Sequence, residues 1–375
     1  MKLEDLQTPC YIVDEALLLH NLEILRALRE RSGCEILLAQ KAFSMFHFYP
    51  LIGQYLSGTA ASGLYEARLG AEEMGKENHI FSPAYREEDF PQIVSLCSHI
   101  IFNSFSQLLR FGPFARAQGV SVGLRLNPEY STQADAHAMY DPCAPCSRLG
   151  VPLGAFQEEH MGLIDGFHFH TLCEQDAEPL EETLAVIEQK FGAFLPRLQW
   201  INFGGGHHIT RPGYNLPLLE RCIRRMRERY GLRVYLEPGE AVALNAGFLA
   251  TRVLDIVHNG MDIAVLDASA ACHMPDVLEA PYRPPLLNEA KDGAGQTYRL
   301  AGPTCLAGDV IGDYTLPKPL QPGDMLLFGD MAIYSMVKNN TFNGMPLPAI
   351  AIRKADGECE VIRRFSYADF KNRLS

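Results

Sequence analysis

The chain has 375 residues, of which 47% are hydrophobic and 21% are charged, and its formal net charge is −12. This length and composition indicate a globular protein of about two domains, and the acidic balance argues against nucleic acid and favours cationic small molecules as partners. The segment from Met1 to Leu6 lacks the apolar core of a signal peptide, and no apolar run is long enough to cross a bilayer, so we expect no membrane partner and a cytoplasmic location.

Strand-like and helix-like runs alternate through the first two thirds of the chain. The strand-like runs are 36–40, 58–62, 79–82, 99–103, 121–126, 165–170, 199–203 and 233–237. Amphipathic, helix-like stretches include 14–31, 65–74, 106–117, 178–191 and 216–230. This alternation predicts an α/β fold in which residues 14–245 form a (β/α)8 barrel, with a doubly wound open sheet as the alternative.

The helical pattern stops near Ala246, and β-rich runs punctuated by Pro and Gly follow. They cover 251–257, 263–266, 297–301, 325–328, 349–352 and 360–365. Such spacing is typical of an antiparallel sandwich or small barrel, so residues 246–375 are predicted to form a separate C-terminal antiparallel β domain.

A barrel places reactive residues at the C-terminal ends of its strands. Lys41, Ser62, His170, the run 204–206 and Glu237 all follow or end predicted strands. A lysine at such a position can lose its proton when desolvated and attack a carbonyl. The simpler alternative is a surface lysine just past a strand end.

The run Gly204-Gly205-Gly206 offers successive backbone N–H groups that could hold an anion, although a tight turn would explain the glycines as well. Glu237 ends the eighth predicted strand with a carboxylate that points into the barrel mouth. Buried carboxylates are rare without a positive partner, so Glu237 forms either a structural salt bridge or a bond to a protonated ring nitrogen.

His168 and His170 lie on one face of a strand because side chains alternate. They form a metal pair, as in barrel hydrolases, a buried structural pair, or a flat platform for a planar cofactor. No further ligands with suitable spacing follow, and His207-His208 adjoins a glycine run that suits an anion, so we expect no metal at this site. A metal-dependent barrel hydrolase remains the alternative class.

Together, a lysine for an imine, an anion nest, a carboxylate for a pyridinium and a flat stacking surface predict pyridoxal 5′-phosphate as the cofactor. A non-enzymatic barrel that binds this cofactor is a second alternative, against which the predicted second domain argues.

The cysteines say less about the function. The spacing of Cys143 and Cys146 supports a zinc or redox role only weakly, and Cys305 could equally be a buried hydrophobic residue.

The chain resembles the fold-type III decarboxylases of basic amino acids, the group that contains ornithine and diaminopimelate decarboxylases. The resemblance spans nearly the whole chain and is strongest with members that act on carboxylated polyamines. The matching segments are Thr8-Pro9-Cys10-Tyr11, Ser82-Pro83-Ala84-Tyr85, 168–174, 203–208, 272–279 and 281–284.

The resemblance implies a role for each matching site residue. Lys41 would carry the cofactor as an imine, His170 would stack on its ring, and Glu237 would bind the pyridine nitrogen. Gly204, Gly205 and Gly206, with Tyr334, would hold the phosphate. Cys305, donated by the partner subunit, would return a proton to the substrate. The implied assembly is a homodimer with shared active sites, in which residues 1–13 join the second domain.

Two positions depart from relatives that act on ornithine or diaminopimelate. Those relatives carry Arg where this chain has Glu240, and an acidic residue where it has Leu306. A carboxylate at position 240 suits a long substrate with several cationic amines. Glu240 and Asp276 are therefore predicted to bind substrate amines, with Glu279 and Asp309 as weaker candidates. Decarboxylation of diaminopimelate, ornithine or arginine remains the alternative, and Tyr85, Arg148 and the connection 127–150 stay unassigned.

Overall fold

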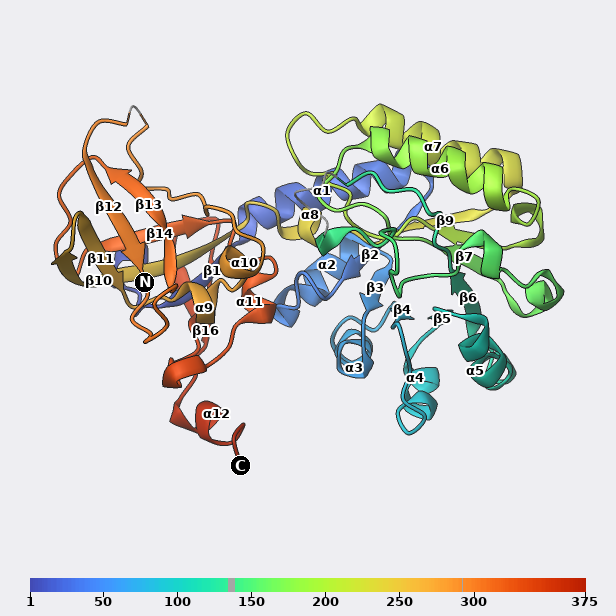
Figure 1. The fold of residues 1–375 in the computed structure, drawn as a ribbon, viewed down its shortest axis with the longest axis horizontal. Helices are drawn as coiled ribbons and strands as arrows, with labels where there is room; N and C mark the ends of the chain where they lie inside the picture. Colours follow the sequence, from blue (N-terminus) through green and yellow to red (C-terminus); the bar gives the residue numbers. More distant parts are fainter. Residues whose placement is uncertain (134–138, 292) are drawn as a thin grey trace. The chain divides into compact units, whose positions relative to one another are not determined.

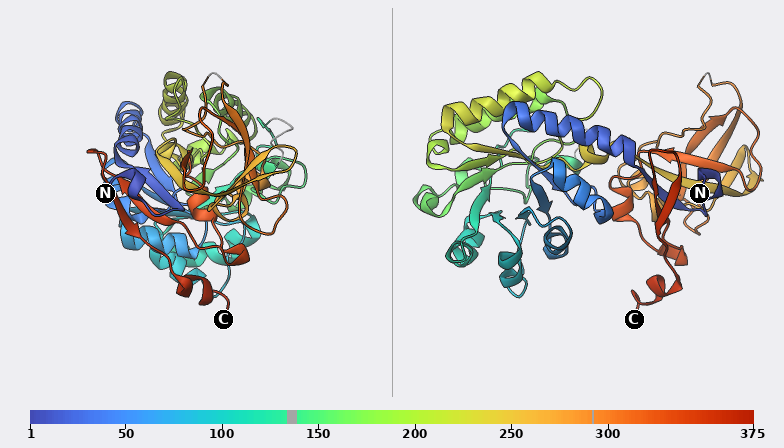
Figure 2. Two further views of the ribbon diagram at one scale, coloured as in Figure 1. Left: turned by 90° about the vertical axis from the view of Figure 1, so that its left-hand side faces the viewer. Right: turned by 180° about the vertical axis from the view of Figure 1, so that it is seen from behind.

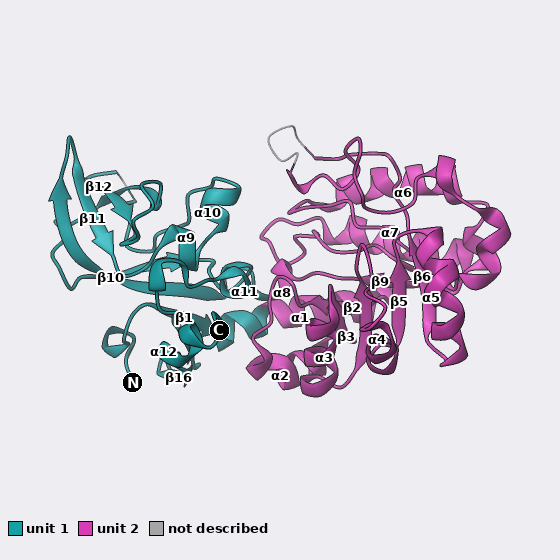
Figure 3. Ribbon diagram, turned by 60° about the horizontal axis from the view of Figure 1, so that its bottom comes forward, with its two compact units in different colours: residues 1–20, 243–375 teal, residues 21–242 magenta. Residues whose placement is uncertain are grey.

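The computed structural model describes residues 1–133, 139–291 and 293–375, and the chain divides into two compact units (Figure 3). Residues 21–242 form one unit, which we call the barrel unit. Residues 1–20 and 243–375 form the other, which we call the sheet unit. The N-terminal segment clusters with the sheet unit because its strand β1 (Cys10–Asp14) pairs with two strands from the C-terminal part of the chain.

The barrel unit is a closed barrel of eight parallel strands, which confirms the predicted fold (Figure 1). The strands are β2 (Glu35–Ala39), β3 (Gly58–Ala61), β4 (Glu77–Phe81), β5 (His99–Phe102), β6 (Ser121–Arg125), β7 (Gly166–His168), β8 (Trp200–Asn202) and β9 (Arg233–Leu236). Pairing of Glu35 with Tyr235 and of Ile36 with Leu236 closes the ring. All eight predicted strands therefore occur in the order expected.

Helices surround this barrel, with α3 to α5 on one side and α6 and α7 on the other (Figures 1 and 2). The helices associated with the barrel are α1 (Glu15–Ser32), α2 (Tyr49–Tyr55), α3 (Leu64–Glu73), α4 (Phe90–Leu96), α5 (Phe105–Ala117), α6 (Ala177–Phe191), α7 (Leu216–Tyr230) and α8 (Glu240–Ala243). Helix α7 begins and ends at residues that cap a helix. The Asn215 side chain accepts a hydrogen bond from the backbone N–H of Leu218, and Gly231 ends the helix in the left-handed region.

The barrel interior is packed around Trp200 rather than hollow. A Cβ added at Gly166 or at Gly123 would lie 2.0 or 2.3 Å from the Trp200 ring, so glycine at both positions makes room for the indole. Tyr235 and Ile101 pack in the same buried cluster. Together these side chains fill the barrel interior up to Ala60 and Phe81, which also line the pocket at the C-terminal ends of the strands.

The sheet unit contains a mixed sheet with strand order β13-β12-β11-β10-β1-β15-β16, and β14 also pairs with β10. Besides β1, its strands are β10 (Gly247–His258), β11 (Asp262–Leu266), β12 (Gln296–Ala301), β13 (Val310–Leu316), β14 (Met325–Gly329), β15 (Ala349–Arg353) and β16 (Cys359–Arg363). Most pairs are antiparallel, as predicted, but β1 pairs with β15 and β11 with β12 in parallel. Long connections allow these parallel pairs, and local alternation does not reveal them.

Two further features of the sheet unit differ from the predictions. Strand β13 was not expected, because Gly312 and Asp313 interrupt its apolar residues. Four short helices also lie beyond Ala246, where no helix was predicted: α9 (Ala270–His273), α10 (Asp276–Glu279), α11 (Ser335–Lys338) and α12 (Tyr367–Lys371). They are too short to show a helical period. Among the described residues, no helix combines the length and apolarity needed to span a membrane.

Candidate functional site

A pocket opens at the C-terminal ends of the barrel strands, where the sequence placed the reactive residues. It is lined by Ala39, Lys41, Ala60, Ala61, Ser62, Phe81, Arg125, His168, His170 and Glu237. The lining combines two cationic side chains, a carboxylate and two imidazoles with apolar walls. This is the composition of a site that binds a polar planar molecule with an anionic group.

Lys41 is held by the turn that follows β2. The N–H of Ala42 donates to the carbonyl of Ala39 at 3.2 Å, and Gly239 packs against this turn so closely that a Cβ there would meet Ala42 Cβ at 2.6 Å. The side chain reaches into the open pocket, where desolvation by its walls and the nearby charge of Arg125 lower the pKa of the ammonium. A lowered pKa gives more of the neutral amine, which is the nucleophilic form.

Glu237 is almost fully buried at the end of β9, and both of its carboxylate oxygens have partners. Oε1 accepts a hydrogen bond from Asn202 Nδ2 at 2.7 Å, and Oε2 lies 3.3 Å from His168 Nε2. Burial alone would raise the pKa of Glu237, but the charge and hydrogen bond of His168, with help from His79 and Asn202, lower it to about 2. Glu237 is therefore an ionised carboxylate that can hold a protonated ring nitrogen.

Arg125 is a site residue that the sequence prediction missed. It is the last residue of β6, only 5% exposed, and its guanidinium carbon lies 4.5 Å from the centre of the Phe81 ring. Its Nη2 donates to the carbonyl of His170 at 3.1 Å. Asn202, the last residue of β8, was also missed. Both could have been found by the rule that identified Lys41, because both end a barrel strand.

His170 lies two residues beyond β7, and its ring is fixed by the glycine run. The N–H of Gly205 donates to His170 Nδ1 at 2.7 Å, so Nδ1 accepts and Nε2 carries the proton. Burial and the charges of Lys41 and Arg125 lower the pKa of His170 well below its ordinary value. A neutral ring held by its edge in this way presents its face for stacking.

In the predicted anion nest over residues 204–206, two of the three N–H groups already have acceptors within the chain. The N–H of Gly204 donates to Asn202 Oδ1 at 2.8 Å, and that of Gly205 is taken by His170, so neither is free for an anion. The N–H of Gly206 has no acceptor among the described residues. Glycine is required here for space, since a Cβ at Gly206 would lie 2.0 Å from the carbonyl oxygen of Leu172. The hydrogen bonds and the tight space of this turn therefore explain most of the glycine run.

Glu240 lies at the start of α8 with a histidine beside it. Its Oε1 is 2.9 Å from His208 Nε2, an ion-pair distance without hydrogen-bond alignment. Although burial would lower the pKa of His208, contact with Glu240 and the charge of Glu174 raise it. Glu174, His208 and Glu240 each offer one ligand atom within 4.8 Å of the others. This cluster carries two carboxylates and is suited to a cationic group.

Cys305 belongs to the sheet unit, where it is exposed on a turn. Its Sγ donates to Asn343 Oδ1 at 2.9 Å, and its backbone N–H donates to the same oxygen at 3.2 Å. Asn343 therefore orients the thiol. It has φ 59°, a left-handed conformation that Asn tolerates better than most residues.

Asp309 is hydrogen-bonded to the same turn. It is 3% exposed, and its carboxylate accepts hydrogen bonds from the hydroxyls of Ser269 at 2.8 Å and Thr304 at 2.6 Å. A Cβ at Gly302 would meet Asp309 Oδ2 at 2.2 Å. Buried and bonded in this way, Asp309 is a structural carboxylate. Its burial and its hydrogen bonds weigh against the prediction that it binds a substrate amine.

Asp276 and Glu279 lie on α10 of the sheet unit, and Lys338 of α11 forms ion pairs with both. Their charge is thus already shared with a cation of the chain.

Tyr334 directly precedes α11 and has φ 52°. The Tyr85 hydroxyl donates to the carbonyl of Ile101 at 2.9 Å, and the Arg148 carbonyl accepts from Asn103 Nδ2 at 2.8 Å. Together with burial, the charge of Arg148 also helps to lower the pKa of Arg125 in the pocket. 

The connection 127–150 is described only in part, because residues 134–138 lie outside the described residues. Before that gap, Thr132 Oγ1 donates to Gln175 Oε1 at 2.7 Å, and Gln133 Nε2 donates to the carbonyl of Thr171 at 3.1 Å. This part of the connection is therefore tied to the segment that follows β7.

The pocket fits pyridoxal phosphate better than a catalytic metal. Among the described residues, the convergent groups of metal ligands are Glu77 with His79 and His99, and Glu174 with His208 and Glu240. Neither includes His168 or His170, and the His168 ring instead stacks near Phe81 and contacts Glu237. An ionised buried carboxylate, a desolvated lysine and a fixed imidazole face are the groups that a pyridine aldehyde requires.

Comparison with known proteins agrees with this chemistry. The family model described as "Pyridoxal-dependent decarboxylase, C-terminal sheet domain" matches residues 10–332. A carboxyaminopropylagmatine decarboxylase from Synechocystis sp. is 44% identical over 100% of this chain and 97% of that protein. A carboxynorspermidine/carboxyspermidine decarboxylase from Campylobacter jejuni is 41% identical over 99% of each chain. The crystal structure of the C. jejuni carboxynorspermidine decarboxylase with norspermidine matches with a TM-score of 0.91 and 40% identity, over 98% of this chain and 100% of that one.

Proposed function

Because the chain belongs to the family of pyridoxal-dependent decarboxylases, we propose that it removes the α-carboxylate of carboxynorspermidine or carboxyspermidine and releases norspermidine or spermidine. The observation that carries this assignment is the match, at 40% identity and over almost the whole of both chains, to a decarboxylase whose structure holds norspermidine. Matches to decarboxylases of related polyamine precursors at 41–44% identity support the same class of substrate.

Each pocket residue would have a separate role toward the cofactor. When bound, pyridoxal phosphate supplies an electron sink for the charge left on the α-carbon as carbon dioxide departs. Lys41 would hold the cofactor covalently in the resting enzyme, and its lowered pKa favours the exchange with the substrate amine. Glu237, ionised and fixed by Asn202, would keep the ring nitrogen protonated. His170 would stack against the ring with Nδ1 tied to Gly205.

The phosphate would be held by fewer backbone groups than the sequence implies. The N–H of Gly206 is the glycine amide that has no acceptor among the described residues, so we assign it to the phosphate. Gly204 and Gly205 would contribute by letting the chain pass close to His170 and Glu237. Tyr334 remains a proposed phosphate contact, based on the resemblance alone.

The proton donor is proposed to come from a second copy of the chain. Cys305 is exposed on the sheet unit, and its thiol points at Asn343. An exposed, oriented thiol outside the barrel suits a group that acts on a neighbouring subunit. The proposal is therefore a homodimer in which each active site combines Lys41 of one subunit with Cys305 of the other.

The substrate amines are assigned first to the cluster around Glu240. Glu240 provides a carboxylate beside the His208 imidazole, and a Glu174 carboxylate oxygen lies within 4.8 Å of the ligand atoms of both, so the cluster offers oxygen acceptors to a cationic group. Asp276 and Glu279 remain weaker candidates because Lys338 already neutralises part of their charge. Any substrate amine at that place would have to compete with the Lys338 ammonium.

A second candidate substrate is carboxyaminopropylagmatine, which the 44% identical relative is named for. It shares cationic character with the carboxylated polyamines, but its distal group is a guanidinium in place of an amine. A guanidinium binds carboxylates in a planar, bidentate fashion, whereas an ammonium binds as a point charge. The carboxylates described above suit a guanidinium as well as an ammonium group. Carboxyaminopropylagmatine is therefore tested in the same experiment as the carboxylated polyamines.

A substrate panel tests the assignment. Carbon dioxide release from carboxynorspermidine, carboxyspermidine, carboxyaminopropylagmatine, diaminopimelate, ornithine and arginine is measured under saturating pyridoxal phosphate. We expect kcat/KM to be highest for carboxynorspermidine or carboxyspermidine. A preference for carboxyaminopropylagmatine moves the assignment to the second candidate, and a preference for diaminopimelate, ornithine or arginine overturns both.

A further inference from the structure

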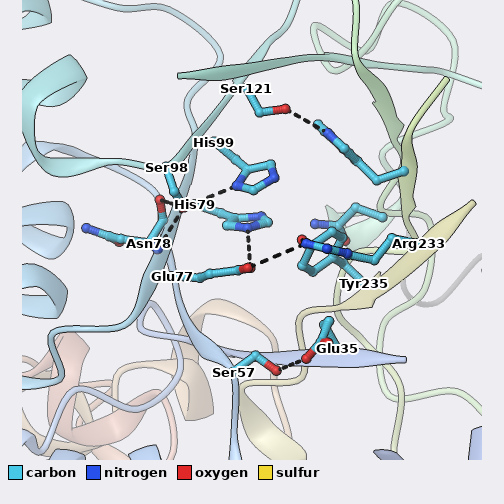
Figure 4. A network of polar contacts seen from close by, with 12 residues as sticks. Glu35, Ser57, Glu77, Asn78, His79, Ser98, His99, Ser121, Arg233 and Tyr235 are labelled. Carbon is cyan, nitrogen blue, oxygen red and sulfur yellow. Dashed lines mark hydrogen bonds and ion pairs between the residues drawn. The ribbon is translucent and has the colours of Figure 1, made fainter. Parts of the chain in front are cut away.

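A cluster of ligating side chains lies at the end of the barrel opposite the pocket and lines no part of it, although the charge of His79 helps to lower the pKa of Glu237. Glu77 and His79 lie two residues apart on β4, so their side chains share one face. His79 pairs in register with His99, the first residue of β5. Figure 4 shows the three side chains turned toward one another, with Tyr235 and Arg233 of β9 beside them.

The three groups converge closely. Each offers one ligand atom, and these atoms all lie within 4.8 Å of one another. The His79 and His99 rings stack with centroids 3.9 Å apart, and His79 Nε2 is 3.4 Å from Glu77 Oε2. A tetrahedral ion with bonds of about 2 Å brings its ligand atoms to within about 3.4 Å of each other. Each imidazole must also point an in-plane lone pair at the ion, so the stacked His79 and His99 rings have to turn out of their stack as the groups approach.

The polar network in this part of the barrel is incomplete without a further partner. His79 is fully buried, and its Nδ1 has no hydrogen-bond partner among the described residues. A buried polar atom of this kind carries a desolvation cost unless a ligand or a rearrangement satisfies it. The Nδ1 atom of His79 is therefore open to a partner, while Nε2 is the ring atom that lies toward Glu77.

The donor atoms of the three side chains suit a cation. An imidazole binds a metal ion through a ring nitrogen and a carboxylate binds it through an oxygen. Two imidazoles and one carboxylate form a donor set that zinc prefers, with one position left for water.

One cation of the chain already approaches the cluster. Arg233 Nη1 lies 3.7 Å from Glu77 Oε1 and 3.1 Å from the Tyr235 hydroxyl. The Arg233 side chain is 58% exposed, so it can move into solvent. It also contacts the oxygen of Glu77 that is turned away from His79. Arg233 would therefore weaken the binding of a metal ion without blocking it.

We propose that Glu77, His79 and His99 bind one divalent transition-metal ion of the zinc type, which ties β4 to β5 at the N-terminal end of the barrel. The site does not depend on the proposed function, since none of its residues lines the pocket around Lys41. Its role would be structural, because it lies at the end of the barrel that is not used for catalysis.

Zinc binding to the purified holoenzyme tests the proposal. After treatment with a chelator, the protein is dialysed against increasing Zn²⁺, and bound zinc per chain and unfolding temperature are measured. We expect His99→Gln to hold one zinc per chain fewer than the parent, or to bind that ion more than about tenfold more weakly. The zinc-dependent rise in unfolding temperature should be smaller to match.

Three variants keep the experiment decisive. Glu77→Gln changes a half-buried side chain and provides the same readout should His99→Gln fail to fold. Arg233→Gln removes the competing cation and should tighten binding. His208→Gln is the matched control, because it breaks the other convergent group and leaves this one intact. Equal zinc content in the parent, His99→Gln and Glu77→Gln overturns the proposal, as does zinc loss in His208→Gln alone.

Discussion

Asn343 is the residue whose effect on the proposed proton donor can be tested most cleanly. It holds both the thiol and the N–H of Cys305 through one amide oxygen. Asn343→Gly should lower kcat by about fivefold with little change in KM, because a hydrogen bond of about 1 kcal/mol that orients the thiol is lost. Steady-state kinetics provide the measurement.

The matched control for that experiment is Asn343→Asp. Glycine accepts the φ of 59° at this position without strain, so Asn343→Gly removes the side chain alone. Aspartate keeps an acceptor oxygen in place and should retain most of the turnover. A normal kcat in Asn343→Gly, or an equal loss in both variants, would contradict an orienting role.

Glu240 is the residue that should decide where the substrate amine binds. Glu240→Gln removes a carboxylate from the cluster with Glu174 and His208 and should raise KM by about 10- to 100-fold, the worth of a hydrogen bond to a charged group, while kcat changes less. The comparison variant is Glu279→Gln, which removes a carboxylate on the sheet unit that Lys338 neutralises. A larger KM effect in Glu279→Gln would move the amine site to α10.

The turn that follows β8 requires glycine at position 206 for steric reasons. Gly206 has φ 82° and a carbonyl 2.0 Å from where a Cβ would lie, whereas Gly213 has φ 84° with nothing within 4 Å. Gly213→Ala should therefore cost about 1 kcal/mol from backbone strain alone. Gly206→Ala adds the clash with Leu172 and should lower the unfolding temperature further and release pyridoxal phosphate.

Thermal unfolding and the cofactor content of the purified variants measure the difference. The two glycines have nearly the same positive φ, so the difference between the variants reflects the close approach of the turn to Leu172. Equal unfolding temperatures and full cofactor content in both variants would show that the turn can relax, and would remove the steric reason for glycine at 206.

At the scale of the whole molecule, the shared active site is the proposal with the clearest consequence. Lys41→Ala and Cys305→Ala should each be nearly inactive as pure proteins. If each site combines the two subunits, mixing them should restore about a quarter of the parental activity, because about half of the dimers are mixed and each of these has one intact site. Activity that stays at the level of the separate variants would contradict a shared site.

Much of this molecule could be predicted from its sequence, because its main features follow local rules. The regular alternation predicted the barrel, and the rule that barrel chemistry lies at strand C-termini brought Lys41 and Glu237 into one pocket. Strand β13 was missed because Gly312 and Asp313 break its pattern. The short helices gave no signal because each is about one turn long.

At the site, the sequence could not show which polar groups are already bonded, since this depends on partners far away in the chain. Nothing near Asp309 in the sequence shows that Ser269 saturates its carboxylate, and nothing near Gly205 shows that His170 takes its amide. Arg125 was overlooked although it ends a strand, because a buried arginine is unusual without a carboxylate nearby in the sequence. Tertiary contacts thus decide which of several plausible polar groups remain available.

The most direct measurement is the absorption spectrum of the purified protein before and after borohydride, followed by peptide mapping. The account predicts a visible band that borohydride removes, with the reduced cofactor attached to Lys41. A band that persists, or a label on another lysine, would contradict the assignment of Lys41 and with it the roles given to Glu237 and His170.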